Sequence, residues 1–305
     1  MAKLSIIIPC YFNENNIPVT ASELIANESR FPLDLLFEYV FVDDGSEDNT
    51  YRELIKLKET YPDKVKVVKL VKNVGSYNAV VAGMEYATGD CLVIISADLQ
   101  DPPELMVKMY EYWLKGFKLV IGSRQERHDS VFQKLPANFF HFIMKKIAFN
   151  KLPQGGFDYV LFDKAIGGKV VEMSEQNSNI MYLMAWMGYD YVNIPYVRSK
   201  RKIGKTRWTF KKRLKLFLDS VFSFSNAPIR AVSGVGLLLG FIFLLYALYL
   251  MINRFFNEKG WSVFETIVLF ATSFHMIALG LLGEYVWRTL DASKKRPLYI
   301  VDKVL

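Results

Sequence analysis

The sequence predicts an α/β fold with a mostly parallel sheet, followed by a membrane-associated carboxy-terminal part. Short β-branched runs alternate with helical stretches, and polar motifs follow the runs, which predicts the α/β part. Apolar residues make up 51% of the chain and concentrate after Ile229, which predicts the membrane part. With 305 residues, the chain is long enough for a globular domain of about 200 residues and a second module.

Five short apolar runs are expected to be strands of one sheet, with ligands at their carboxyl ends and helices on both faces. The start of the chain, residues 1–9, lacks a small-residue cleavage site, so we interpret it as a buried strand and not as a secretory signal. We therefore expect the amino-terminal domain, residues 1–200, to stay in the cytosol. The expected strands are 4–8, 39–42, 65–71, 92–95 and 119–121, and the expected helices are 51–61, 77–87 and 104–115.

The two cysteines, Cys10 and Cys91, lie beside predicted strands, and we expect buried free thiols because a cytosolic domain offers no oxidising environment. The formal net charge is +7, and ten basic residues but no acidic one lie between Arg198 and Lys215. Because this run directly precedes the hydrophobic region, it indicates a membrane surface and not a nucleic acid as the partner.

Two uncharged stretches, 231–253 and 266–283, predict a pair of transmembrane helices. The first matches the roughly 30 Å hydrocarbon thickness of a bilayer, and the second is long enough when Trp261, Tyr285 and Trp287 are counted as interfacial anchors. The alternative, two buried helices of a soluble protein, is disfavoured because helices apolar on every side are rare there. The expected parts are 229–290 for the pair, with spans at about 230–253 and 263–287, and 291–305 for the tail.

Basic residues crowd before the first span and after the second, whereas the short connection holds only Arg254 and Lys259. The positive-inside rule therefore places both chain ends in the cytoplasm, in a multi-pass plasma membrane protein. A juxtamembrane region, residues 201–228, is expected to contain an amphipathic helix at 208–224 that lies on the headgroups. Residues 132–149 carry a similar aromatic stripe and fit an interfacial helix or a buried core helix equally well.

Neither G-x-G-x-x-G after the first strand nor G-x-x-x-x-G-K-[ST] occurs, so a nucleotide must be held in another way. Asp43 and Asp44 follow a predicted strand, and one of these carboxylates is suited to accept from a ribose hydroxyl or a base N–H. A plain solvent-exposed turn is the alternative for this pair.

The stretch ISADLQDPPE, residues 95–104, places carboxylate and amide oxygens directly after an apolar strand. Asp98, Gln100 and Asp101 are the hard oxygen ligands that suit a divalent cation bridging a diphosphate. A helix N-cap at Asp101, with Pro102 at the first helical position, also fits this stretch.

Six motifs occur in a fixed order along the chain. They are P-C-Y-F-N-E (9–14), V-D-D-G-S (42–46), K-N-V-G (72–75), A-D-L-Q-D-P-P-E (97–104), G-S-R (122–124) and R-x-x-G-K-T-R-W (201–208). In this order, and with the predicted hairpin, the chain resembles the polyprenol-phosphate glycosyltransferases of glycosyltransferase family 2, which include bactoprenol glucosyltransferases and dolichol-phosphate mannose synthases. The resemblance extends over nearly the whole chain, including G-E-Y-V-W-R and R-P-x-Y between 283 and 299. It implies a Rossmann-like glycosyltransferase-A domain and suggests a homotetramer.

The resemblance also implies site residues. Asp98 and Gln100 would ligate Mg²⁺ or Mn²⁺, and the expected catalytic residues are Asp98, Arg124, Arg201 and Arg207. Many relatives have an acidic residue where this chain has Ser96, so the cation is expected to have fewer protein ligands, and whether Asp98 also positions the acceptor stays open. The residues expected at the phosphates are Arg124, Arg201 and Arg207, and those expected to line the uridine or guanosine pocket and its surroundings are Pro9, Tyr11, Glu14, Asp43, Asp44, Asn73, Gly75 and Ala97.

The expected acceptor is a polyprenyl phosphate such as undecaprenyl phosphate, and the expected donor is a nucleotide sugar, with UDP-glucose favoured by the resemblance. A lipid phosphomonoester has a second pKa of about 6, so it is largely a dianion near neutral pH and needs little help from a general base. Arginines from the basic run would bring the two anionic groups together. We expect in-line attack with inversion, giving a β-linked product.

Two alternatives remain open. A processive polysaccharide synthase usually carries Q-x-x-R-W and enough spans for a pore, whereas here Gly204 occupies the glutamine position before Arg207-Trp208. A catalytically silent membrane protein that binds sugar nucleotide is the second, and Ser96 keeps it open. The three histidines have no metal-ligand spacing and are expected to be structural.

Overall fold

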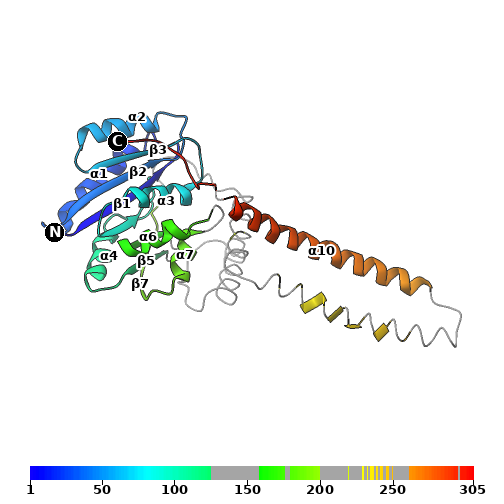
Figure 1. Ribbon diagram of the computed structural model, residues 1–305. Helices are drawn as coiled ribbons and strands as arrows, with labels where there is room; N and C mark the ends of the chain where they lie inside the picture. The colour runs from blue at the N-terminus through cyan, green and yellow to red at the C-terminus, as the bar shows by residue number, and fades with distance from the viewer. Residues whose placement is uncertain are drawn as a thin grey trace. The chain divides into compact units, whose positions relative to one another are not determined.

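The structure of the chain is a computed structural model that describes residues 1–124, 158–175, 179–199, 261–294 and 296–305, with isolated helical positions between 219 and 249 (Figure 1). The chain divides into two units. The first consists of Met1–Ser220 together with Pro297–Leu305, and the second of Val221–Arg296.

Within the described residues, the first unit is built on one sheet with the strand order β7-β5-β6-β4-β1-β2-β3-β8. The strands β1, β2, β3 and β4 are mutually parallel, and β5 pairs in parallel with β7. The strand β6 lies antiparallel between β4 and β5. The expected mostly parallel sheet is confirmed. The strands are β1 Lys3–Cys10, β2 Leu36–Asp43, β3 Val65–Leu70, β4 Cys91–Ile94, β5 Leu119–Arg124, β6 Tyr159–Asp163, β7 Tyr191–Tyr196 and β8 Val301–Val304.

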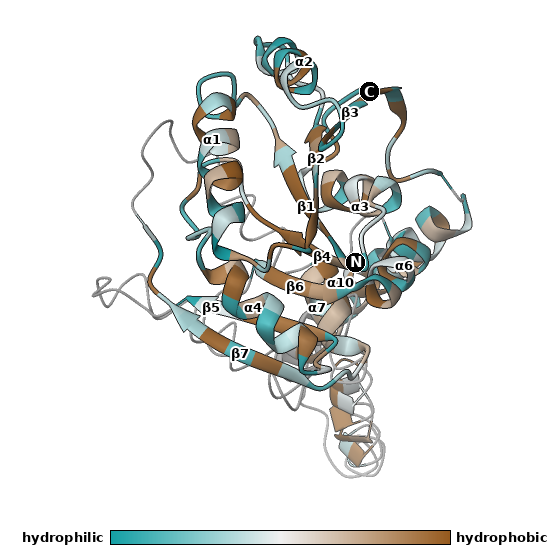
Figure 2. Ribbon diagram, turned by 90° about the vertical axis from the view of Figure 1, so that its left-hand side faces the viewer, coloured by the Kyte–Doolittle hydropathy of each residue, from teal (hydrophilic) through white to brown (hydrophobic). Residues whose placement is uncertain are grey.

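Helices cover both faces of this sheet, as the continuous apolar runs predict. Side chains of β1 point alternately to the two faces of the sheet. On one face, Leu4, Ile6 and Ile8 belong to the core shared with α1, α2 and α4. On the other face α3 packs so closely that a Cβ at Gly83 would lie 2.5 Å from Ile7 Cγ2. Figure 2 shows the hydrophobic strands between these helices. The helices are α1 Ile17–Asn27, α2 Thr50–Thr60, α3 Ser76–Tyr86, α4 Leu105–Leu114, α6 Lys164–Met173 and α7 Ile180–Trp186.

The sequence-based expectations for this core are confirmed in most details. Each predicted strand coincides with one of β1 to β5, and each predicted helix with α2, α3 or α4. Cys10 and Cys91 are buried free thiols, as expected. The N-cap suggested at Asp101 is wrong, since α4 begins at Leu105 after a turn in which the Leu105 N–H donates to the carbonyl of Pro102 at 3.1 Å.

The last residues of the chain form β8, which pairs antiparallel with β3. Lys69 on β3 and Asp302 on β8 form an ion pair at 3.0 Å, and the Tyr299 hydroxyl donates to Glu85 of α3. The strand β8 thereby occupies the edge of β3, a position that would otherwise leave unpaired backbone groups. The tail expected at 291–305 thus contributes a strand to the sheet.

The second unit contains α10, Trp261–Ser293. A Cβ at Gly236 would lie 3.3 Å from Phe274 Cε1, so Gly236 lies beside Phe274 of α10. Arg288 and Glu284 form an ion pair one turn apart at 2.9 Å. Among the residues described, no helix has the combined length and apolarity that crossing a membrane requires. The predicted transmembrane pair stays a prediction.

Candidate active site

The polar motifs of the sequence meet at one edge of the sheet. Because β1 to β4 are parallel and β5 runs in the same direction, their carboxyl ends lie along the same edge. This edge carries two groups of interacting side chains, one after β1, β2 and β3, the other after β4, β5 and β7. The expected residues found along it are Pro9, Tyr11, Glu14, Asp43, Asp44, Asn73, Gly75, Ala97, Asp98, Gln100 and Arg124.

Asp43, the last residue of β2, is fully buried but incompletely hydrogen-bonded. Its Oδ1 accepts from the Ser46 N–H at 3.1 Å, whereas its Oδ2 has no hydrogen-bond partner among the described residues. Burial raises the pKa of this carboxyl, and the Ser46 hydrogen bonds oppose the rise. A buried carboxylate oxygen without a donor carries a desolvation cost that a ligand N–H or O–H removes on binding.

Asp44, the next residue, has a different role. Its Oδ1 accepts from the Val74 N–H at 2.7 Å, and its Oδ2 accepts from the Gly75 N–H at 3.0 Å and from Asn73 Nδ2 at 2.9 Å. Asp44 therefore holds the K-N-V-G loop beside the end of β2. Gly45 makes this approach possible, since its φ is +65° and a Cβ there would lie 2.6 Å from the carbonyl carbon of Lys72.

The loop after β1 is fixed against the start of α2. The Phe12 N–H donates to Ser46 Oγ at 3.1 Å, and the Asn13 N–H donates to Thr50 Oγ1 at 2.7 Å. Glu14 Oε2 accepts from the N–H and the side-chain amide of Asn49, which precedes α2. Phe12 adopts φ +55°, a left-handed conformation that a bulky residue keeps only where its surroundings impose it.

The loop after β4 contains a second left-handed residue, Leu99, with φ +47°. Asp98, the residue before Leu99, accepts two hydrogen bonds at its Oδ1. One comes from Ser96 Oγ at 2.7 Å, and the other comes from the Gln100 N–H at 3.3 Å. The Ala97 carbonyl accepts from Thr20 Oγ1 of α1 at 2.7 Å. The loop is thus held from α1 while its Asp98 carboxylate is oriented by its own neighbours.

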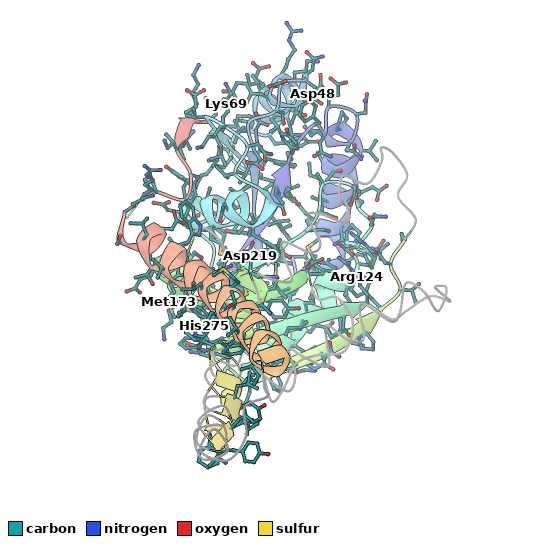
Figure 3. All side chains as sticks on the ribbon, turned by 90° about the vertical axis from the view of Figure 1, so that its right-hand side faces the viewer. Asp48, Lys69, Arg124, Met173, Asp219 and His275 are labelled. Atoms are coloured by element: carbon teal, nitrogen blue, oxygen red, sulfur yellow. The ribbon has the colours of Figure 1, made fainter. Side chains whose placement is uncertain are left out.

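Asp101, grouped with the cation ligands on sequence grounds, is turned toward β7 and β5. Its Oδ1 accepts from the Tyr196 hydroxyl at 2.5 Å and lies 3.3 Å from Arg198 Nε. Arg124, labelled in Figure 3, ends β5 with its Nε 4.0 Å from the same oxygen and its Nη2 bonded to Asp158 Oδ2 at 2.6 Å. Burial lowers the pKa of Arg124, but the carboxylates of Asp158 and Asp101 outweigh burial and raise the pKa above its usual value.

The donor set near Asp98 fits a divalent cation that completes its ligands from elsewhere. No group of three or more His, Cys, Asp or Glu side chains arranged to hold a metal ion occurs in the described part of the chain. Asp98 offers one carboxylate, with the Ser96 hydroxyl beside it, and the Asp101 carboxylate is already paired with Arg198. Mg²⁺ and Mn²⁺ accept such sites, because Mg²⁺ is commonly bound by one or two carboxylates together with waters and substrate phosphates.

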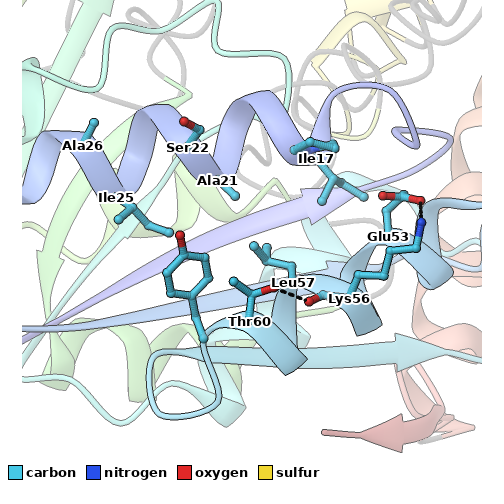
Figure 4. A pocket seen from close by; sticks show the side chains of 11 residues that line it. Ile17, Ala21, Ser22, Ile25, Ala26, Glu53, Lys56, Leu57 and Thr60 are labelled. Carbon is cyan, nitrogen blue, oxygen red and sulfur yellow. Dashed lines mark hydrogen bonds and ion pairs between the residues drawn. The ribbon is translucent and has the colours of Figure 1, made fainter.

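A shallow groove between α1 and α2 is a separate feature of this unit (Figure 4). Its walls are largely apolar, from Ile17, Ala21 and Ile25 on α1 and Leu57 on α2. Glu53 and Lys56, which lie at one end of it, are paired with each other at 2.6 Å. The residues that line the groove include no cluster that would bind a phosphate or a cation, so the carboxyl edge remains the candidate active site.

Some expectations fall outside the described residues, namely Arg201, Arg207, His128, His141, the helix at 132–149 and nearly all of the helix at 208–224. The structure adds residues that the sequence did not single out. Ser46 joins Asp43 to the loop after β1, and Tyr196 and Arg198 meet Asp101. Arg198 belongs to the basic run, but nothing in its spacing distinguishes it from the other cations there.

The fold and these loops define an α/β protein with a candidate ligand site at the carboxyl edge of a mostly parallel sheet. Residues 5–170 match the model of the family described as Glycosyl transferase family 2. The chain belongs to this family and is a glycosyltransferase, which confirms the resemblance seen in the sequence.

Individual relatives agree with this assignment. The uncharacterized glycosyltransferase YkcC of Bacillus subtilis (strain 168) is 34% identical over 303 residues, 98% of this chain and 93% of that protein. The prophage bactoprenol glucosyl transferase homolog of Escherichia coli (strain K12) is 30% identical over 306 residues, 99% of each chain. The mannosyltransferase PcManGT from Pyrobaculum calidifontis, solved in complex with GDP-Man and Mn²⁺, gives a TM-score of 0.51 at 20% identity, over 95% of this chain and 84% of that one. The likeness to the mannosyltransferase supports the fold.

Proposed function

We propose that the protein transfers a hexose, with glucose as the first choice, from a uridine diphosphate sugar to a polyprenyl phosphate such as undecaprenyl phosphate. The observation that carries the donor half of this proposal is the buried Asp43 Oδ2, which has no hydrogen-bond partner among the described residues. This oxygen lies at the carboxyl edge, where ligands of such sheets bind, and it can accept a hydrogen bond from an N–H or O–H of the nucleoside.

The acceptor half of the proposal is supported by the relatives. Besides the Escherichia coli protein, the bactoprenol glucosyl transferase of Shigella phage SfX is 29% identical over 303 residues, 98% of each chain. Those names concern the relatives, and we extend their acceptor class to this chain. The basic run between Arg198 and Lys215 also suits a lipid phosphate at an anionic membrane surface.

We further propose that the enzyme works at the cytoplasmic face of the plasma membrane, with the transmembrane pair at about 230–253 and 263–287 as its anchor. This proposal is supported by the two uncharged stretches of the sequence and by the basic residues that flank them. A water-soluble donor and a lipid acceptor meet only where the catalytic edge is held near the bilayer. The homotetramer suggested by the resemblance stays a prediction.

The chemistry that the site supports is the meeting of two phosphate-bearing substrates. The lipid phosphomonoester is largely a dianion near neutral pH, so the chain's task is to orient it and to reduce repulsion, with Arg124 as one cation. Asp98, with Ser96 and Gln100 beside it, would hold Mg²⁺ or Mn²⁺, which when bound neutralises charge on the leaving diphosphate. We propose in-line attack at the anomeric carbon with inversion.

A transfer assay with a panel of donors tests this function. Membranes that contain the full-length protein are incubated with a divalent cation, undecaprenyl phosphate and, in turn, radiolabelled UDP-glucose and other nucleotide hexoses. We expect chloroform-soluble label with one donor and a β linkage in the product. Absence of lipid-soluble label with every donor would contradict polyprenyl phosphate as the acceptor, and an α linkage would refute inversion.

A further inference from the structure

Asp101 is a buried carboxylate at the active-site edge that the proposed reaction has not yet used. It is 3% exposed, and its Oδ1 accepts from the Tyr196 hydroxyl at 2.5 Å. Its Oδ2 lies 3.4 Å from Ser96 Oγ, the hydroxyl that also donates to Asp98. A buried carboxylate stays charged only when it is paired, so the groups that pair with Asp101 indicate its role.

Two guanidinium groups direct Nε toward the same oxygen of Asp101. Arg198 Nε lies at 3.3 Å and Arg124 Nε at 4.0 Å, and neither Nε has a hydrogen bond of acceptable geometry among the described residues. Arg124 has a second acid, because its Nη2 donates to Asp158 at 2.6 Å. Within the described part of the chain, the ion pair of Arg198 is made with Asp101 alone.

The backbone also fixes Arg198 beside the loop that follows β4. Tyr196 ends β7, and the N–H of Ser199, the residue after Arg198, donates to the Gln100 carbonyl at 2.8 Å. Arg198 is therefore positioned from two sides, by its neighbour's backbone and by the Asp101 carboxylate at its Nε. Its side chain is 33% exposed, so the guanidinium is anchored but not enclosed.

We propose that Arg198 is an oxyanion-binding residue of the transfer site and that Asp101 is the carboxylate that positions it. The ion pair with Asp101 is made at Nε, so it leaves the two terminal nitrogens of the planar Arg198 guanidinium available, and this fork matches two oxygens of a phosphate group. The inference rests on the proposed function, which supplies two phosphate sources, the diphosphate of the donor and the phosphomonoester of the lipid. A purely structural role, in which the ion pair only ties β7 to the loop, predicts a loss of stability without a loss of anion affinity.

The test compares full-length wild-type protein in detergent with Arg198→Gln, Arg198→Lys and a matched control, Arg30→Gln. Arg30 pairs with Glu104 at 3.8 Å, and both side chains are more than half exposed, so it is an arginine–carboxylate pair of the same region without an active-site position. Calorimetric titration with UDP reports on the donor diphosphate. The KM for undecaprenyl phosphate and for the nucleotide sugar, measured separately with kcat, distinguishes the two sources.

We expect Arg198→Gln to weaken UDP binding or to raise the acceptor KM by roughly tenfold or more, as the loss of one charged hydrogen bond predicts. Arg198→Lys should recover part of the loss, because it keeps the charge and loses the fork, and Arg30→Gln should match wild type. If Arg198→Gln lowers only the melting temperature and changes neither UDP affinity nor either KM, the inference is overturned. If wild type transfers no sugar to lipid, the proposed function fails, while the UDP titration still decides whether Arg198 binds a diphosphate.

Asp101 is tested through its coupling to Arg198. Asp101→Asn should produce the Arg198→Gln defect, and the double variant should be no worse than either single one, because one residue acts through the other. Tyr196→Phe removes one hydrogen bond of Asp101 without removing its charge. This variant replaces Asp101→Asn in the test if Asp101→Asn does not fold. Additive defects in the Asp101 and Arg198 variants, or unchanged anion affinity in every Asp101 and Tyr196 variant, would contradict the positioning role.

Discussion

Asp44 and Gly75 are joined across the carboxyl edge of the sheet, because the Gly75 N–H donates to Asp44 Oδ2 at 3.0 Å. The other oxygen of the same carboxylate accepts from the Val74 N–H at 2.7 Å. One side chain after β2 thus sets the path of the loop after β3, and it does so with both oxygens as acceptors. Burial raises the pKa of Asp44 and backbone hydrogen bonds lower it, with a net value of about 6.

This value predicts opposite effects of pH on stability and on donor binding. As pH falls, Asp44 is protonated at a higher pH in the folded state than in the unfolded state. The contribution of Asp44 to stability therefore falls as pH rises from 3.8 to about 6. Donor binding should rise as pH rises through about 6, because only the ionised carboxylate accepts on both oxygens and holds the loop. The measurement is the affinity for UDP-glucose against pH, since its diphosphate is esterified at both ends and has no proton to lose near pH 6. An affinity that is flat between pH 5 and pH 7 would contradict the assignment.

Replacement of Asp43 should separate binding from stability. Asp43→Asn removes a buried charge whose Oδ2 has no partner, so stability should hold or increase slightly, whereas UDP affinity should fall by about tenfold or more. Calorimetry with UDP and thermal unfolding of the full-length protein measure the two effects. Asp63→Asn, at an exposed position before β3, is the matched control. Equal UDP affinity in Asp43→Asn and wild type would exclude Asp43 from the donor pocket.

At the opposite ends of the strands, Glu38 is expected to matter for stability alone. Burial raises its pKa, but hydrogen bonds from Ser5, Thr88 and Lys66 outweigh burial and lower the value to about 2. The stabilisation is fully present above the ordinary pKa of 4.5 and is lost as pH falls toward 2. We predict that Glu38→Gln costs roughly 3 kcal/mol near neutral pH. Its melting temperature should therefore depend less on pH between 4.5 and 2 than that of wild type.

The control for this prediction is Glu53→Gln, which breaks the exposed pair with Lys56. Surface pairs of this kind contribute about 0–1 kcal/mol, so the melting temperature should barely change. Equal losses of stability in the two variants would show that the hydrogen bonds around Glu38 stabilise the fold no more than a surface ion pair does.

The central strands, β1 to β5, could be predicted because they are short β-branched runs separated by helical stretches and polar loops. The remaining strands had weaker signals: β8 consists of Val301-Asp302-Lys303-Val304 and is largely exposed, so no buried pattern marks it. Its partner β3 lies more than 200 residues away in the sequence, and only the folded chain brings them together. The antiparallel β6 likewise has an apolar run, but its direction depends on its neighbours β4 and β5.

The positions of the candidate site residues were predictable, whereas the division of roles among them was not. Adjacent carboxylates look alike in a sequence, yet Asp44 holds a loop while the Asp43 Oδ2 has no hydrogen-bond partner among the described residues. Asp98 and Asp101 were grouped as cation ligands, but Asp101 is paired with Tyr196 and Arg198, whereas Asp98 accepts from Ser96 and from the Gln100 N–H. Left-handed Leu99 lies between them and redirects the chain, and a leucine gives no sequence signal for such a conformation.

Sugar transfer by Asp98→Asn, compared with wild type, tests whether Asp98 belongs to the active site. Both full-length proteins are assayed in membranes with labelled UDP-glucose, undecaprenyl phosphate and Mg²⁺, after thermal unfolding has shown that they are equally stable. We predict chloroform-soluble label with wild type and at least a hundredfold less with Asp98→Asn, on the order expected when a group that stabilises developing charge is removed. Equal labelling by the two proteins would remove Asp98 from the active site and contradict the proposed site.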